Sequence, residues 1–334
     1  MNDLSTLHTF GVAASSLDLL ILKSTQNLNE LTTVIESGRP LMILGSGSNC
    51  VFTEDFQGVV AVNQLSGIAV TETNTSFNIN VASGENWHKL VEFCLANNIY
   101  GFENLALIPG TVGAAPIQNI GAYGRELNEF VSSVEYVDLL NGKQYSLDAQ
   151  DCQFGYRDSI FKRPKAKHWF ITHVNFTLPK AAYQPETSYG ELAALEDPTP
   201  QRIFDKVCEI RRKKLPDPSV LGNAGSFFKN PVLSAEAFQS LRQQFPSVPS
   251  YPVNQDKIKI PAAWLIDQCG FKGETLGGVR CHHTQPLVLT NIGGARGADV
   301  ITLARKISTT IKQRFNIDLE NEVRLIGRQG LVNL

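Results

Sequence analysis

The feature that most constrains the fold is a glycine-rich stretch over residues 107–124, LIPGTVGAAPIQNIGAYG. Its glycines are spaced through small apolar residues, and its only polar side chains are Thr111, Gln118, Asn119 and Tyr123. Glycine lets a backbone approach a ligand closely, and a loop of N–H and C=O groups can satisfy both a diphosphate and the edge of a heteroaromatic ring. We therefore expect a large, flat ligand to lie against this stretch.

A second run of small residues, ILGSGSNC, follows an apolar segment at 40–45 that is typical of a strand. Such a turn can direct backbone N–H groups at an anion, although an ordinary glycine turn is an equally good explanation of the run alone. A dinucleotide fingerprint would need a third glycine and a helix opening at the loop, and a P-loop would need Gly-Lys-Ser/Thr. Neither pattern is present.

Composition places the chain among folded soluble proteins. It has 334 residues, of which 43% are hydrophobic and 19% charged, and this length predicts two or three compact units. The net charge of −2 lacks the basic surplus that phosphate backbones demand, so we expect no nucleic-acid partner. The basic run at 211–214 is interpreted as the end of a helix, where cations suit the helix dipole.

The cysteines and the N-terminus indicate a cytoplasmic protein. The six cysteines stand singly, without a Cys-x-x-Cys pair, so neither a zinc site nor a disulfide framework is predicted. Residues 1–23 lack a basic segment followed by a sustained apolar one, and no apolar run reaches the roughly 20 residues of a membrane span. We expect no membrane association.

Periodicity predicts a mixed α+β protein. Strands are expected at 40–45, 58–62, 76–84, 170–178 and 319–327, and an Asn141-Gly142 turn joins two more. Helices are expected at 85–98, with His88 on the solvent side, and at 298–315. A third helix is expected to begin with Thr199 as N-cap and Pro200 as its first residue.

Several further motifs occur in order after the glycine-rich stretches: FGYRDSIFK, NAGSFFKNP, AAWLIDQCGFKG and LENEVRLIG, which begin at residues 154, 223, 262 and 319. Together they resemble the signatures of the UDP-N-acetylenolpyruvoylglucosamine reductase family, and the resemblance runs from about residue 8 to the end. SYGEL at 188–192 is similar to the tyrosine loop of the first of two family types. The resemblance implies a two-lobed vanillyl-alcohol-oxidase-type FAD-binding fold with a C-terminal α+β substrate-binding domain.

The activity that the resemblance implies is one step of peptidoglycan synthesis for the cell wall. NADPH reduces a non-covalent FAD, a hydride passes to C3 of an enolpyruvyl group, and C2 is protonated to give UDP-N-acetylmuramate. The carbanion-like C2 calls for a cation at the neighbouring carboxylate and for a proton donor. The resemblance assigns Arg157 to the carboxylate, Ser226 to the proton and Glu322 to the orientation or stabilisation of the intermediate.

Without the resemblance, Ser226 in its Gly-Ser sequence would be interpreted as a turn hydroxyl. A nucleophilic serine is a weaker interpretation, because the sequence has no Gly-x-Ser-x-Gly elbow here and no histidine in an arrangement typical of an activated serine. The remaining roles also follow from the resemblance. The residues assigned to FAD are Gly45, Ser46, Gly47, Ser48, Asn49, Ile108, Pro109, Gly110, Thr111, Gly113, Gln118, Asn119, Gly121, Ala122, Tyr123 and Arg324. Those assigned to the substrate are Tyr156, Tyr189, Lys214, Asn230, Tyr251, Lys259, Lys272 and Gln285.

Cys281-His282-His283 is assigned no metal, because adjacent histidines cannot easily converge on one ion.

We expect a first FAD-binding lobe at 1–66, joined by 320–334, a second at 67–214 and a substrate-binding domain at 215–319, in a monomer that binds a small-molecule substrate. Outside enzymes, the alternative is a nucleotide-sugar-binding module without turnover, which would be purified without visible flavin. The main alternative is a flavin oxidase of the same fold that acts on a carbohydrate or lactone. Such oxidases usually tether the flavin to a His or Cys, and no histidine falls between residues 9 and 87.

Overall fold

The computed structural model describes residues 1–181 and 183–334. Contacts between Cα atoms divide the chain into two compact units, and each is formed by segments that are distant in sequence. Unit 1 comprises Met1–Ser16, Ser48–Gln57 and Lys214–Leu334, and unit 2 comprises Leu17–Gly47 and Gly58–Lys213. Two strands begin in unit 1 and continue into unit 2, β2 (Ser15–Leu22) and β5 (Phe56–Asn63).

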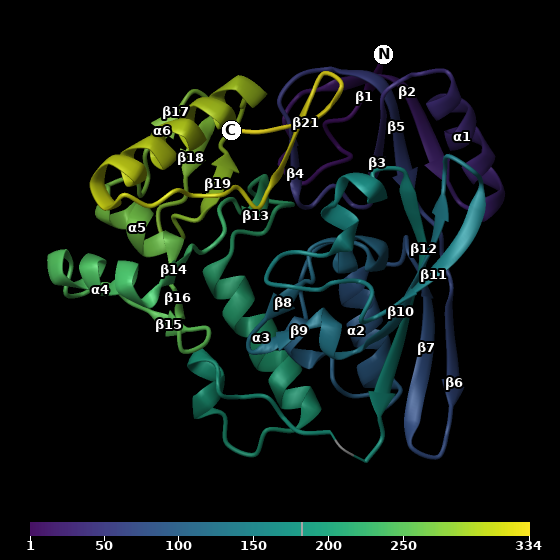
Figure 1. Ribbon diagram of the computed structural model, residues 1–334, viewed down its shortest axis with the longest axis horizontal. Helices are drawn as coiled ribbons and strands as arrows, with labels where there is room; N and C mark the ends of the chain where they lie inside the picture. Colours follow the sequence, from purple (N-terminus) through teal and green to yellow (C-terminus); the bar gives the residue numbers. More distant parts are fainter. Residues whose placement is uncertain (182) are drawn as a thin grey trace. The chain divides into compact units, whose positions relative to one another are not determined.

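Unit 2 is built on an antiparallel five-stranded sheet, in the order β11-β10-β12-β7-β6 (Figure 1). The strands are β6 (Ile68–Glu72), β7 (Ser76–Ala82), β10 (Val131–Asp138), β11 (Lys143–Asp148) and β12 (Trp169–Pro179). On β12 the residues Phe170, Val174 and Phe176 are buried, as the predicted alternation requires. The Asn141-Gly142 turn connects β10 to β11 as predicted.

Helices complete the core of unit 2. Trp87, Leu90 and Val91 from α2 (Trp87–Ala96) and Val207 from α3 (Pro200–Lys214) pack in one cluster with sheet residues such as Val174. The Thr199 hydroxyl accepts a hydrogen bond from Arg202 N at 3.3 Å, which confirms the predicted start of α3. Besides short 3-10 helices, unit 2 contains α1 (Leu28–Glu36), β3 (Leu41–Leu44), β8 (Gly121–Ala122) and β9 (Arg125–Glu126), and β3 pairs in parallel with β5.

Unit 1 has its own core, in which α6 (Gly297–Phe315) and α5 (Ala262–Gln268) pack on small sheets. One sheet has the order β13-β19-β18-β17, a second β14-β16-β15 and a third β21-β20-β4. The strands are β1 (Asn2–Asp3), β4 (Cys50–Phe52), β13 (Asn223–Ser226), β14 (Val232–Ser234), β15 (Tyr251–Pro252), β16 (Lys257–Lys259), β17 (Thr275–Leu276), β18 (Val279–Cys281), β19 (Val288–Asn291), β20 (Arg324–Gly327) and β21 (Gly330–Val332); the remaining helix is α4 (Ala235–Gln244).

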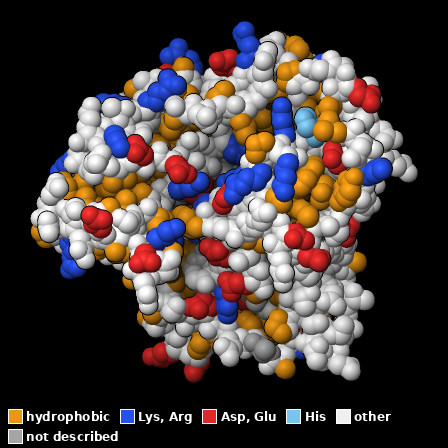
Figure 2. Space-filling model, viewed as in Figure 1, with side chains coloured by type: hydrophobic (Ala, Val, Ile, Leu, Met, Phe, Trp, Pro, Cys, Tyr) orange, Lys and Arg blue, Asp and Glu red, His pale blue; other side chains and the backbone are white. Residues whose placement is uncertain are grey.

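The predicted terminal strand is shorter than expected. It begins at Arg324, not at residue 319, although Leu319 and Val323 are buried as the alternation predicted. The backbone N–H of Glu322 bonds to Phe227 O at 2.8 Å, so this part of the chain pairs with the segment after β13. Among the residues that the structure describes, no helix is both long and apolar enough to cross a membrane. Basic and acidic side chains are interspersed on the face shown in Figure 2.

Candidate active site

The two glycine-rich stretches meet in unit 2. A Cβ placed on Gly45 would lie 2.4 Å from Thr111 Oγ1 and 3.1 Å from its Cγ2, so the turn after β3 packs directly on the longer stretch. The longer stretch is held in turn by backbone hydrogen bonds from Val112 N to Glu85 O and from Gly113 N to Ser83 O, each 2.8 Å. The sequence predicted both loops, and the structure shows that they are neighbours.

Several residues of this region adopt left-handed backbone conformations that side chains disfavour. Leu107, Asn119, Tyr123 and Arg157 have φ values of +55°, +44°, +49° and +52°. Each such conformation costs about 1–3 kcal/mol and persists where the surroundings impose it, commonly at ligand sites. The strained backbone conformations therefore lie in the glycine-rich stretch at 107–124 and at Arg157, which is predicted to bind the substrate carboxylate.

Arg157 is attached to the glycine-rich stretch. Its Nη2 donates a hydrogen bond to Gly121 O at 3.0 Å, and its guanidinium carbon lies 5.7 Å from the centre of the Tyr156 ring. The structure thus brings together a predicted catalytic residue, Arg157, a predicted substrate residue, Tyr156, and a predicted cofactor residue, Gly121. The contact places a guanidinium, whose planar fork of N–H donors matches a carboxylate, beside the stretch.

The side chain of Asn119 forms hydrogen bonds within the protein. Its Nδ2 donates to Glu126 Oε2 at 2.8 Å and to Gly155 O at 3.3 Å, while its Oδ1 accepts from Asn128 N at 3.0 Å. The residue is fully buried. Its amide therefore links the glycine-rich stretch to the loop that carries Arg157.

The expectation that His88 faces solvent is wrong. Its Nδ1 accepts a hydrogen bond from Leu107 N at 3.1 Å, and its ring stacks on Phe204 at 5.6 Å. Burial lowers its pKa, Arg212 and Arg211 lower it further, and Glu92 opposes them. The neutral ring keeps Nδ1 available as an acceptor and supports strained Leu107 where the stretch begins. The apolar pattern of α2 could not predict these contacts of His88, because α3 and Leu107 come from other parts of the chain.

Ser226 lies at the end of β13 in unit 1, where the strand pairing is irregular. Asn223 pairs with Thr290 and Ser226 with Val288, so β13 has one more residue than β19 between the two pairs. Such bulges redirect side chains and are frequent next to active sites. The residue after Ser226, Phe227, accepts the backbone hydrogen bond of Glu322. Two of the predicted catalytic residues are therefore held close together by the backbone.

Asn49 belongs to the same group in unit 1. Its backbone oxygen accepts from Arg324 N at 3.0 Å, and its Nδ2 donates to Glu322 O at 3.3 Å. The parallel pairing of β4 with β20, Cys50 opposite Arg324, fixes this arrangement. Burial lowers the pKa of Arg324. Two predicted FAD residues, Asn49 and Arg324, thus adjoin the predicted catalytic Glu322.

The remaining predicted substrate residues are dispersed. In unit 1, Tyr251 and Lys259 are opposite each other on β15 and β16, and Lys214 ends α3. Asn230 Oδ1 accepts from Ala262 N at 2.9 Å, so that oxygen caps α5.

Two others have partners in unit 1. Lys272 Nζ bonds to Asp267 Oδ2 at 2.8 Å. Gln285 N donates to His282 Nδ1 at 3.2 Å.

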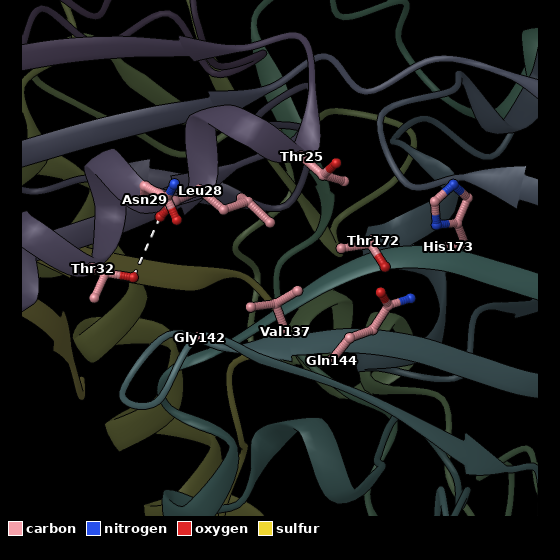
Figure 3. Close-up of a pocket in the computed structure, with 9 residues that line it drawn as sticks. All are labelled: Thr25, Leu28, Asn29, Thr32, Val137, Gly142, Gln144, Thr172 and His173. Carbon is pink, nitrogen blue, oxygen red and sulfur yellow. Dashed lines mark hydrogen bonds between the residues drawn. The ribbon is translucent and has the colours of Figure 1, made fainter.

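A hollow of about 240 Å³ in unit 2 is separate from these residues (Figure 3). It lies between α1 and the strands β10, β11 and β12, and is lined by Thr25, Leu28, Asn29, Thr32, Val137, Gly142, Gln144, Thr172 and His173. None of these was predicted to have a role in the site. The hollow is therefore not the active site that the sequence predicts.

Comparison with known proteins identifies the family. Residues 19–148 match the FAD binding domain family, and residues 217–326 match the C-terminal domain of UDP-N-acetylenolpyruvoylglucosamine reductase. The UDP-N-acetylenolpyruvoylglucosamine reductase of Pseudoalteromonas atlantica is 53% identical over 334 residues, covering 100% of this chain and 96% of that protein. The chain belongs to the UDP-N-acetylenolpyruvoylglucosamine reductase family.

Other members agree with this assignment. The UDP-N-acetylenolpyruvoylglucosamine reductase of Escherichia coli K12 is 45% identical over 335 residues, covering 99% of this chain and 98% of that protein. The crystal structure of the reductase from Thermus caldophilus has a TM-score of 0.67 at 23% identity and covers 96% of each chain. The predicted fold, an FAD-binding region of the vanillyl-alcohol-oxidase type followed by a C-terminal α+β domain, is confirmed.

The residues present fit the FAD of this family. The close approach of Gly45 to Thr111 leaves no room for a side chain at residue 45, so the two stretches pack directly on each other at this point. The two stretches carry backbone N–H groups and neutral Ser, Thr and Gln side chains, and this set of donors suits a diphosphate and a flavin ring edge. We call residues 107–124 the flavin stretch from here on.

Proposed function

We propose that this chain reduces the enolpyruvyl group of UDP-N-acetylglucosamine enolpyruvate and forms UDP-N-acetylmuramate for peptidoglycan synthesis. It is an FAD-dependent oxidoreductase that uses NADPH. Held by the turn at 45–49 and the flavin stretch, FAD would supply hydride transfer from NADPH to the enolpyruvyl double bond. The observation that carries the proposal is 53% identity to a named reductase over the entire chain.

We assign Arg157 to the substrate carboxylate. Its guanidinium is already fixed by the bond to Gly121 O and by the Tyr156 ring. A guanidinium held in place beforehand stabilises negative charge that develops on the carboxylate, without reorganisation during the reaction. Tyr156 contributes by keeping the guanidinium in this orientation.

We assign Ser226 to the proton that C2 receives. A serine hydroxyl stays protonated at neutral pH, and a strongly basic carbanion makes transfer from such a weak acid possible. Glu322 adjoins this segment through its backbone bond to Phe227 O, and we assign its carboxylate to orienting the reacting group. Enolpyruvyl reduction needs this proton once per turnover.

We assign binding of the nucleotide diphosphate to Tyr189, Lys214 and Asn230, and further substrate contacts to Tyr251, Lys259, Lys272 and Gln285. For FAD we propose the residues of the turn at 45–49, those of the flavin stretch and Arg324. Because the side chain of Asn119 is engaged with Glu126, Gly155 and Asn128, we propose that it shapes the stretch and that its backbone faces the cofactor.

We further propose that the protein is a cytoplasmic monomer with three functional regions: 1–66 with 320–334, 67–214 and 215–319. Light scattering of the holoenzyme tests the monomer, because a dimer would double the measured mass.

An anaerobic titration tests the activity. NADPH should bleach the flavin absorbance, and UDP-N-acetylglucosamine enolpyruvate should restore it. Acid precipitation should release the FAD into the supernatant, whereas an oxidase with a covalent tether would retain it. Reoxidation by oxygen but not by the enolpyruvyl substrate would refute the proposed function.

A further inference from the structure

A buried asparagine connects the flavin stretch to the segment that carries Tyr189. Asn104 Nδ2 donates one hydrogen bond to Tyr123 O at 2.7 Å and another to Glu186 O at 2.8 Å. The side chain is 2% exposed. A side-chain amide nitrogen has two hydrogens, and both are used here to join two backbone carbonyls that are distant in sequence. We call residues 183–192 the tyrosine loop.

Other contacts fix the same end of the tyrosine loop. Arg125 Nη2 donates to Gln184 O at 2.7 Å. A Cβ on Gly124, which has a φ of +88°, would lie 2.8 Å from Glu186 Cγ, so the flavin stretch packs directly on the loop. The Tyr123 and Tyr189 rings meet edge to face at 6.0 Å. Each of these contacts runs from residues 104–125 to the tyrosine loop.

The chemistry of these contacts explains why residue 104 is an amide. Two carbonyl oxygens that face one buried point need two donors, and unpaired buried carbonyls cost free energy. An aspartate of the same shape would present only acceptors to both oxygens, and an apolar residue would present nothing. The two bonds are therefore specific for the amide.

We propose that Asn104 is a positioning residue for substrate binding, because it clasps the tyrosine loop onto the flavin stretch and so presents Tyr189 to the nucleotide diphosphate. Arg125 is the second part of the clasp. The kinetic part of this inference rests on the proposed function; the existence of the clasp does not.

Hydrogen exchange of the holoenzyme tests the clasp directly. Within the loop, Ser188 N donates to Glu186 Oε1 and Leu192 N donates to Tyr189 O, so these amides report its order. With Asn104→Asp, peptides covering 183–192 should exchange about tenfold faster or more, as the loss of two hydrogen bonds implies. The control is Asn97→Asp, because Asn97 Nδ2 donates to Phe93 O of α2, which is not part of the tyrosine loop.

Arg125→Gln is a second variant that leaves the buried amide intact. It should also speed exchange in 183–192, by less than Asn104→Asp, and it keeps the test decisive if Asn104→Asp fails to fold. Wild-type exchange of the tyrosine loop in both variants, or in Arg125→Gln if it alone folds, would overturn the clasp.

Half-reaction kinetics test the positioning role. Both variants should reduce the flavin with NADPH at the wild-type rate, but they should need a higher concentration of enolpyruvyl substrate to reoxidise it. Faster loop exchange with an unchanged concentration dependence would overturn the role of Asn104 in substrate binding and leave the clasp standing. If the wild-type protein does not react with this substrate at all, the proposed function fails, and the exchange measurement still decides the clasp.

Discussion

Gly45 lies against Thr111 so closely that a methyl group cannot be added between them. A Cβ on Gly45 would lie 2.4 Å from Thr111 Oγ1, well inside normal contact distance. This contact joins two loops that are more than sixty residues apart in the sequence and are both predicted to bind FAD. The spacing between the loops should therefore control cofactor affinity.

Gly45→Ala should lower the affinity for FAD by separating the two loops. Overpacking of this kind costs about 1–3 kcal/mol, which corresponds to a rise of about 5- to 150-fold in the FAD dissociation constant. Fluorescence titration of the apoprotein with FAD measures this constant. In the Thr111→Ala background, which lacks Oγ1 and Cγ2, Gly45→Ala should lower FAD affinity by less than it does in wild type, because the steric contact is gone. An equal loss in both backgrounds would make the steric explanation incorrect.

Ser226→Ala should separate the two half-reactions. Flavin reduction by NADPH should proceed at the wild-type rate, while reoxidation by the enolpyruvyl substrate should slow by about 10²- to 10⁴-fold, as for a lost general acid. Stopped-flow absorbance times each step. Ser240→Ala, at an exposed residue of α4, is the control. Equal slowing of both steps, or a change in substrate affinity alone, would show that another group supplies the proton.

Tyr189→Phe should mainly raise the KM for the nucleotide-sugar substrate. Its ring is 51% exposed and contacts Tyr123 through an edge, so removal of the hydroxyl leaves the packing unchanged. A hydrogen bond to a charged group contributes about 1.5–3 kcal/mol, or about 10- to 150-fold in KM. Tyr145→Phe, at an exposed tyrosine of β11, should leave KM unchanged. An unchanged KM in Tyr189→Phe would remove this residue from the diphosphate site.

Glu103 should make stability depend on pH. Burial raises its pKa to about 7 from an ordinary value of 4.5, although Gly101 N donates to both carboxylate oxygens. Between these values the unfolded chain has lost the proton and the folded protein keeps it, so stability falls as pH rises from about 4.5 to about 7. The shift corresponds to about 3 kcal/mol.

Glu103→Gln should remove this dependence, because the amide does not titrate. Urea titrations at pH 5 and pH 8 should show the variant gaining stability relative to wild type by up to about 3 kcal/mol at the higher pH. Glu36→Gln, at an exposed carboxyl ending α1, is the control. A difference between Glu103→Gln and wild type that is the same at both pH values would mean that Glu103 titrates in its ordinary range.

The local sequence pattern predicted helices and strands well where each buries one face, because the spacing of the apolar residues then reveals the type of element. The alternation of β12 and the capping of α3 at Thr199 required no information from elsewhere in the chain. The start of β20 did depend on distant residues, because Glu322 N bonds to Phe227 O instead of continuing the strand. Long-range pairings of this type leave no periodic signal.

The site was predictable only in part for the same reason. Glycine spacing indicated the flavin stretch, and the resemblance to the reductase family indicated Ser226 and Arg157. The supporting residues carried no local signal, because His88 and Asn104 act through partners 19 and 82 positions away. Their chemistry is visible only once those partners are in place.

The pairing of β4 with β20 has a consequence for how the protein is made. Thr53 and Ile326, which adjoin this pair and are hydrogen-bonded, are 273 positions apart. A ribosome therefore exposes the apolar segment Cys50–Phe52 long before it synthesises the strand that pairs with it. At about 5–20 residues per second that interval is about 14–55 seconds, during which the strand edge is open to wrong partners. The pair of β4 and β20 therefore cannot form until synthesis of the chain is almost complete.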